Sequence, residues 1–159
     1  MVEYRQLIRE PPFCQNLERR QGLKCRVKGV LVVDMIADAH LDTHPDTHST
    51  PWLSDLVFAQ ARRRGYARYL LRSPRAIEDD HLPLLEVGVP AIDIIDLDYG
   101  PFNLYWHSRF DTIDRCSPAS LAVVARVVLA SLVALAANLS LKPKTGGPAA
   151  ESDWMACRL

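Results

Sequence analysis

Three clusters of acidic and histidine residues are the part of the sequence best suited to chemistry. They are, in chain order, Asp34 with Asp38, the run Glu78-Asp79-Asp80-His81, and His107, which follows Trp106 and precedes Asp111 and Asp114. Imidazole nitrogens and carboxylate oxygens are ligands of catalytic zinc, and further carboxylates orient the ring of a ligating histidine. A carboxylate at a strand end and a histidine on a later loop can converge on one metal ion, so these clusters are candidates for a zinc site.

Each cluster also has an interpretation without chemistry. Asp34 can be an ordinary loop or helix-cap residue that follows a strand. The acidic residues 78–80 can stabilise the N-terminus of a following helix through its dipole. His107 can be a packed loop histidine. None of the three clusters is a diagnostic motif by itself.

A further set of histidines, His40, His44 and His48, recurs every four residues, as on one face of a helix. Pro45 follows the second of them and disfavours helical geometry at the preceding residue. We therefore interpret residues 37–50 as a solvated loop rather than a metal-binding helix.

The elements that would hold these clusters alternate between strand and helix. The run VLVV at residues 30–33 predicts a strand buried on both faces, as in parallel sheets. Asp34 ends this strand, at the edge where open α/β sheets bind ligands. We expect a second strand at 91–96, a short strand at 67–71, and helices at 51–65, 81–87 and 117–141. This order indicates an α/β fold with a mainly parallel sheet and packed helices.

The last helix, from Ser117 to about Leu141, is almost entirely apolar. Its length is close to that of a membrane span, but Arg126 and the many alanines favour a buried helix of a folded domain. We expect it to pack on the sheet through Leu121, Val124, Val128 and Leu132.

Composition narrows the classes of function. The chain has 159 residues, with 19 basic and 19 acidic side chains and no net charge. It therefore lacks the charge of a basic nucleic-acid-binding module, and we expect no nucleic-acid or membrane partner. The scattered cysteines, Cys14, Cys25, Cys116 and Cys157, favour free thiols. No signal peptide is visible, and the sequence assigns no compartment.

Taken in order, the clusters and their flanking residues resemble the C-terminal half of the M28 zinc metallopeptidases, which include aminopeptidases and glutaminyl-peptide cyclotransferases. The similar blocks are GVLVVDMIAD (29–38), STPWLSD (49–55), IEDDHLPLLEVGVPAIDIIDLDYG (77–100) and YWHSRFDTIDRCSPASL (105–121). The resemblance implies a truncated zinc-aminopeptidase-like (phosphorylase/hydrolase-like) fold. It divides the chain into an unmatched segment 1–14, a domain 15–141 and a flexible tail 142–159.

The resemblance also implies roles for particular residues. Asp34 matches the strand-end aspartate, a zinc ligand in two-metal aminopeptidases and a catalytic hydrogen-bonding residue in cyclases. His107 matches the last metal ligand of the family. Asp79 resembles the catalytic cyclase aspartate and Trp106 the tryptophan of the substrate pocket. Asp80 and His81 are expected to orient the residues that contact the metal or the substrate, without contacting either themselves.

The sequence departs from the family upstream of Gly29. The family has a His-x-Asp motif there, with a metal-ligating aspartate, and a Glu-Glu pair that supplies the general base and another ligand. This stretch contains only Glu3, Glu10 and Glu18 as acidic residues and has no histidine. Ser108 and Ala37 stand where the family usually has threonine and glycine.

These departures leave fewer ligands than a catalytic zinc requires, which is typically three from the protein. We therefore expect weak or no zinc binding and little activity on peptide N-termini from the chain alone, so whether it is an enzyme stays open. Three readings remain: a fragment of an active enzyme, a degenerate peptide- or partner-binding domain, or a half-site completed by a complementing chain. The tryptophan before His107 and the Asp-Asp-His triplet favour glutamine cyclisation slightly over aminopeptidase hydrolysis.

Overall fold

The computed structural model describes residues 27–140, with the side chains of residues 27–137. The segment 1–14, the tail 142–159 and three of the cysteines lie outside the described residues. Cys116 is a free thiol, as expected. The elements are β1 (Val30–Asp34), α4 (Pro51–Arg63), α5 (Ala67–Leu70), α6 (Leu82–Glu86), β2 (Ala91–Ile95), two single-turn 3-10 helices (Pro101–Asn103 and Ile113–Arg115) and α7 (Pro118–Ser140).

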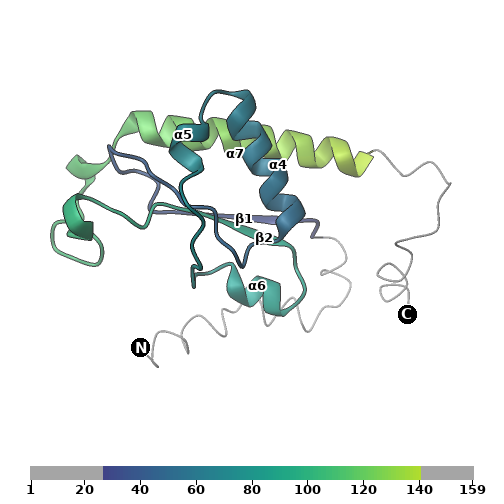
Figure 1. Cartoon of the computed structure of the whole chain (residues 1–159), viewed down its shortest axis with the longest axis horizontal. Helices are drawn as coiled ribbons and strands as arrows, with labels where there is room; N and C mark the ends of the chain where they lie inside the picture. Colours follow the sequence, from purple (N-terminus) through teal and green to yellow (C-terminus); the bar gives the residue numbers. More distant parts are fainter. Residues whose placement is uncertain (1–26, 141–159) are drawn as a thin grey trace.

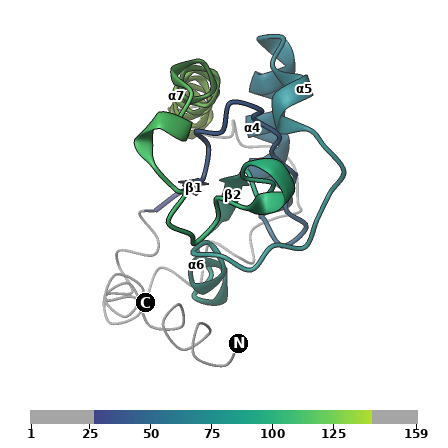
Figure 2. The same ribbon diagram turned by 90° about the vertical axis from the view of Figure 1, so that its left-hand side faces the viewer.

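The sheet of the described residues consists of β1 and β2, which pair in parallel from Val30 opposite Ala91 to Asp34 opposite Ile95. The connection between them carries α4, α5 and α6. Helices α4 and α7 cover one face of this sheet and α6 covers the other (Figures 1 and 2). The predicted α/β class, both main strands and the three main helices are therefore confirmed.

The two strands differ in burial. All five residues of β2 are buried, whereas β1 is half-buried and its end is exposed, with Val33 at 38%. The expectation that β1 is buried on both faces is therefore wrong for the described part of the chain. The physical reason is that β1 has a strand neighbour there on one side only.

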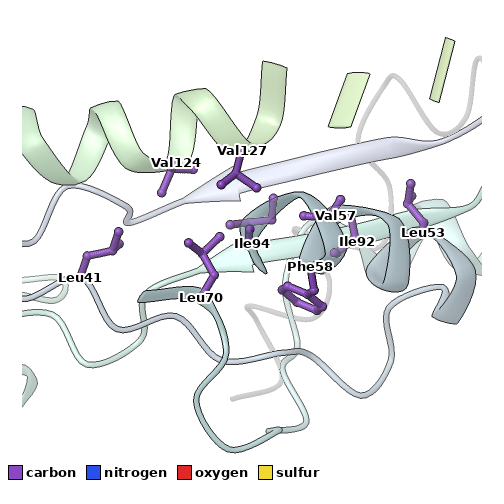
Figure 3. Close-up of a cluster of buried hydrophobic side chains, with 10 residues drawn as sticks. Leu41, Leu53, Val57, Phe58, Leu70, Ile92, Ile94, Val124 and Val127 are labelled. Atoms are coloured by element: carbon purple, nitrogen blue, oxygen red, sulfur yellow. The ribbon is translucent and has the colours of Figure 1, made fainter. Parts of the chain in front are cut away.

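The main core lies between α4, α7 and the sheet (Figure 3). Val57 of α4, Ile92 of β2 and Val127 of α7 are among its fully buried side chains. Burial of each such side chain is worth roughly 1.5–3 kcal/mol. A smaller cluster under α6 contains Leu84 and Val89. Together these contacts fix the direction of β1 and β2 and hence the positions of the residues that follow them.

Helix α7 is rotated relative to our expectation. Val124 is buried and Val128 packs against the core, but Leu121 and Leu132 are 41% and 47% exposed. The buried line runs instead through Ser120, Val124, Val127, Ser131 and Leu135. A helix that is apolar all around carries no hydropathy contrast to mark its inner face. It is also the one described helix long and apolar enough to span a membrane by length and composition.

The segment 67–71 is not a strand. It forms the short helix α5, directly after the turn at Gly65, whose φ is +73°. The backbone N–H of Tyr66 donates to the carbonyl of Ala61, which folds the chain back at the end of α4. This local turn leaves the segment beside α4 rather than in the sheet.

Candidate active-site pocket

An open pocket of about 590 Å³ lies at the carboxyl end of the sheet. Its walls come from three segments far apart in the sequence: the end of β1, the loop before α6, and the stretch that runs from the end of β2 into the loop before α7. The lining side chains that could take part in binding or catalysis are Asp34, Glu78, Asp79, Tyr99, Trp106, His107 and Asp111. Asp34, Asp79, Trp106 and His107, four residues with predicted roles, thus line one cavity, although those roles stay predictions.

The backbone around the pocket is unusual. Met35 and His107 have φ angles of +50°, which non-glycine residues rarely adopt. The N–H of Met35 donates to Oδ1 of Asp34 at 2.8 Å, which fixes that carboxylate at the strand end. The rings of Trp106 and His107 meet edge to face, with centroids 4.7 Å apart. Strained residues of this kind gather at functional sites.

Asp79 has the environment of a proton-transfer group. It is 8% exposed, Oδ1 accepts the N–H of Asp80 at 2.8 Å, and buried Oδ2 has no hydrogen-bond partner among the described residues. Burial raises the pKa of Asp79 above its usual range, and the carboxylate of Asp34 adds to this rise, against the hydrogen bond from Asp80. A carboxylate with a raised pKa accepts a proton more readily than an ordinary one, which suits it to proton transfer.

The loop that carries Trp106 and His107 is anchored by Asp38. Its Oδ2 accepts the N–H of Gly100 at 2.6 Å. Gly100 has a φ of +71°, and a Cβ there would lie 2.2 Å from Cδ2 of Tyr105, so only glycine fits. The hydroxyl of Tyr99 donates to Asp111 at 2.7 Å, and this bond and burial raise the pKa of Tyr99 to about 12. Asp38 and Asp111 therefore hold the loop in place.

Asp80 and His81, the expected supporting residues, lie outside the pocket lining. Asp80 is exposed, whereas His81 is fully buried. Its Nε2 lies 2.9 Å from Oδ2 of Asp46, and its Nδ1 lies 3.8 Å from Oδ2 of Asp93. His81 thus lies between two buried carboxyl groups that sequence reasoning did not single out, although neither of its ring nitrogens makes a hydrogen bond among the described residues.

Asp46 is the centre of this buried polar cluster. Its oxygens accept hydrogen bonds from the N–H groups of His48, Ser49 and Ile77 and from the hydroxyl of Ser49. Burial alone would raise the pKa of Asp46, but the His81 imidazole and these donors together hold it well below its usual range. An aspartate that accepts from the backbone N–H groups two and three residues later forms a recognisable side-chain turn. The spacing Asp46-x-x-Ser49 is therefore the sequence signal that could have revealed the role of Asp46.

This cluster corrects the interpretation of residues 37–50 as a solvated loop. Thr43, His44, Asp46 and Ser49 are all buried. The Nδ1 of His44 lies 2.8 Å from the carbonyl oxygen of Ser73, and its Nε2 lies 3.1 Å from Oδ2 of Asp98. The loop can be buried because its polar groups form hydrogen bonds with distant segments of the chain. A local sequence pattern does not predict such bonds.

Zinc is the metal that the sequence implies, and the described part of the pocket offers too few closely placed ligands to hold it alone. His107 is the only imidazole in the lining, and among the described residues the one group of three potential metal ligands is Asp46, His48 and His81. Their ligand atoms lie within 4.8 Å of one another, so by spacing they could hold an ion. The oxygens of Asp46 are already occupied by hydrogen bonds, however, and His48 Nδ1 lies 2.9 Å from the carbonyl oxygen of Ile77. A cation there would have to displace these partners.

Asp93 occupies the far side of His81 and is fully buried, with neither oxygen hydrogen-bonded among the described residues. Burial and the nearby carboxylate of Asp79 raise the pKa of Asp93 to about 7. The folded protein therefore keeps a proton on Asp93 through a pH range in which the unfolded chain, with an ordinary pKa of 3.8, has already lost it.

By linkage, this difference makes the folded state less stable as pH rises from about 4 to about 7. We expect Asp93→Asn to remove that dependence and to raise the stability above pH 7 relative to the unmodified chain, with little gain at pH 4. Urea unfolding at pH 4 and pH 8 measures both effects. An equal effect of the substitution at both pH values would contradict the assigned proton.

The fold and pocket define an α/β domain with a ligand site at the carboxyl edge of a parallel sheet. Comparison with known proteins gives the class. Residues 18–132 match the peptidase family M28, so the chain belongs to the M28 peptidase family. No curated protein sequence matches it.

Several solved structures are similar. A glutaminyl cyclase from an Acidobacteriales bacterium is 34% identical, with a TM-score of 0.75 over 79% of this chain and 44% of that protein. The glutaminyl cyclase of Tannerella forsythia is 25% identical (TM-score 0.59, 65% and 38%). A Zn-dependent exopeptidase from Parabacteroides distasonis is 27% identical (TM-score 0.56, 65% and 38%). The chain thus spans less than half the length of these solved proteins.

Proposed function

We propose that this chain is the C-terminal part of a zinc-dependent M28-type enzyme that acts on peptide N-termini, by cyclisation of N-terminal glutamine. The observation that carries the proposal is the single pocket that brings together Asp34, Asp79, Trp106 and His107 from distant segments. The similarity to several glutaminyl cyclases supports the choice of substrate.

In this proposal the chain binds one end of the substrate and moves one proton. The indole of Trp106 offers an apolar wall to the glutamine side chain. The α-amine forms a bond to the side-chain amide carbon, and the amide nitrogen leaves as ammonia. Asp79, with its raised pKa, takes the proton from the attacking amine and returns it to the leaving nitrogen. Asp34 accepts a hydrogen bond at the same centre.

Zinc would polarise the amide carbonyl as a Lewis acid. His107 would be one of its ligands, and the remaining ligands would have to come from outside the described residues. In this proposal the chain alone therefore has little or no activity. Another polypeptide segment supplies the missing ligands and completes the site.

Two alternatives have specific support. The Zn-dependent exopeptidase similarity favours hydrolysis of the first peptide bond, in which Asp34 would be a metal ligand. The sparse ligand set of the pocket favours a non-catalytic domain that binds a peptide or a partner chain.

A chimera tests these functions. Residues 27–140 replace the matching part of the Acidobacteriales glutaminyl cyclase, which supplies the rest of the domain. We expect the chimera to release ammonia from a peptide with N-terminal glutamine and not to release the first residue of an alanyl peptide. Release of that residue would favour the exopeptidase alternative. A folded, zinc-loaded chimera with neither activity would favour the non-catalytic one.

The chain alone provides the complementary measurement. We expect zinc titration to give no tight site and no rise in the thermal midpoint, because a ligand stabilises only the state that binds it. Turnover of either substrate by the purified chain with stoichiometric zinc would contradict the proposal that the chain needs completion.

A further inference from the structure

A second hollow, of about 630 Å³, lies between the C-terminal half of α4 and α7, away from the active-site pocket. We call it the α4–α7 groove. Its α7 wall consists of Arg126, Leu129, Ala130, Val133, Ala134 and Ala137, and its α4 side of Gln60, Arg63, Arg64 and Tyr66. These ten residues lie outside the fold's sheet and do not overlap the lining of the active-site pocket.

The α7 wall of the groove is largely apolar and exposed. Leu129 and Val133 are 63% and 71% exposed, on a helix whose opposite face is buried in the core. Ala130, Val133, Ala134 and Ala137 follow the spacing i, i+3, i+4, i+7, which places them along one stripe of α7. Their small side chains allow the backbone of another helix to approach closely, and ridges of that helix would fit the hollow between α4 and α7.

The rim of the groove is cationic. Arg63, Arg64 and Arg126 line it, and its lining includes no aspartate or glutamate. Arg126 donates to the hydroxyl of Tyr66 at 3.3 Å, and Arg64 to Oε1 of Gln60 at 2.8 Å. These neutral acceptors hold two guanidinium groups at the rim without neutralising them. The arginines at the C-terminal end of α4 also stabilise that helix through its dipole. Arg126 lies inside α7, so the dipole does not explain its presence there.

We propose that the α4–α7 groove is a docking site for an amphipathic helix of a partner protein, with an apolar stripe and carboxylates along its flanks. The apolar stripe would cover Leu129 and Val133, and the carboxylates would pair with the arginines, whose planar groups suit bidentate contacts. A second copy of this chain fits poorly, because it would bring its own arginines against these. A lipid surface fits poorly as well, because the site is a hollow between two helices rather than a projection.

Two synthetic peptides of about three heptads provide the probe. Both carry leucine at the positions facing the groove, and they differ only in flanking glutamate or flanking lysine. We expect the glutamate peptide to bind the full chain at least about tenfold more tightly than the lysine peptide, with weaker binding at high salt. Fluorescence anisotropy of labelled peptides measures both affinities.

Charge reversal gives the matched control. The double variant Arg63→Glu with Arg64→Glu should reverse the preference between the peptides, and Val133→Asp should weaken both. Circular dichroism verifies that each variant is folded, and all substituted side chains are exposed, so folding should survive. Equal binding of both peptides, or an unchanged preference in the double variant, would overturn the proposal.

Two further measurements test the other occupants. Sedimentation velocity of the chain alone should show a monomer, and vesicles of phosphatidylcholine with phosphatidylglycerol should not retain it. A dimer that Val133→Asp dissociates, or vesicle binding that the arginine reversal abolishes, would assign the groove to that occupant and overturn the proposal.

Discussion

Asp34→Asn in the chimera should lower kcat/KM for an N-terminal-glutamine peptide by at least about 10²-fold. The carboxylate of Asp34 lines the pocket, and the loss of one preorganised hydrogen-bonding group at a reacting centre costs about 10²–10³-fold in rate. Asparagine keeps the shape of the side chain but cannot carry the negative charge. Ammonia release, followed by a coupled assay, gives the rate, and metal analysis gives the zinc content of the same sample.

The zinc content separates the two enzyme classes. If Asp34 hydrogen-bonds the substrate, as the cyclase proposal has it, the variant keeps its zinc, whereas if it ligates a metal, one equivalent is lost. Asp55→Asn is the control, because Asp55 is exposed on α4 and outside the pocket lining. Full activity of the Asp34 variant would contradict the catalytic role. If the Asp55 control lost as much activity as the Asp34 variant, the loss would indicate a general effect on folding instead.

Asp46→Asn should destabilise the chain by about 1–3 kcal/mol, the cost of losing hydrogen bonds to a buried carboxylate. The substitution leaves His81, which is fully buried, without its carboxylate at 2.9 Å. It also weakens the hydrogen bonds that fix residues 46–49. The free energy of unfolding of a small domain is about 5–15 kcal/mol, so the expected loss is a substantial fraction of the total stability. The urea midpoint of the purified chain measures it.

The same contact predicts a pH dependence of opposite sign to that of Asp93. The pKa of Asp46 is held below its usual range, so its contribution to stability is present above about pH 4, the pKa of an unfolded aspartate. That contribution is lost as pH falls from about 4 toward the lower pKa of the folded state. The difference between the unmodified chain and Asp46→Asn should therefore shrink on acidification below pH 4.

A milder variant keeps this prediction testable if the asparagine variant does not fold. Ser49→Ala removes one donor to Asp46 and should cost about 1 kcal/mol. Asp55→Asn again provides the exposed control and should change the midpoint little. A midpoint unchanged in Ser49→Ala and in Asp46→Asn alike would show that the polar cluster does not hold the fold.

Two of the site residues that the sequence suggested, Asp34 and His107, lie at or after the end of a strand with a clear local pattern. Asp34 directly follows a run of β-branched residues, and His107 lies in a loop bounded by a strand and a long helix. Carboxyl ends of parallel strands lie at one edge of a sheet. The convergence of Asp34 and His107 on one pocket could therefore be anticipated from the pattern of elements, without knowledge of side-chain contacts.

The buried polar cluster could not be anticipated in the same way. Asp46, His81 and Asp93 come from a loop, the start of α6 and the middle of β2. Each is a residue type that is usually exposed or half-exposed, and only partners from the other two segments compensate its burial. A local reading of 37–50 therefore predicted a solvated loop, and a local reading of 89–97 gave no reason to single out Asp93.

The class of fold, the two parallel strands, the main helices and the membership in the M28 peptidase family could all be inferred from local sequence patterns. These depend on periodicity, turn residues and short motifs, which are properties of neighbouring residues. Contacts between distant segments set which face of α7 is buried, which polar groups are inside and which arginines line the α4–α7 groove. The physical reason is that a uniformly apolar helix has no preferred face, and a polar side chain enters the interior only where folding supplies its partners.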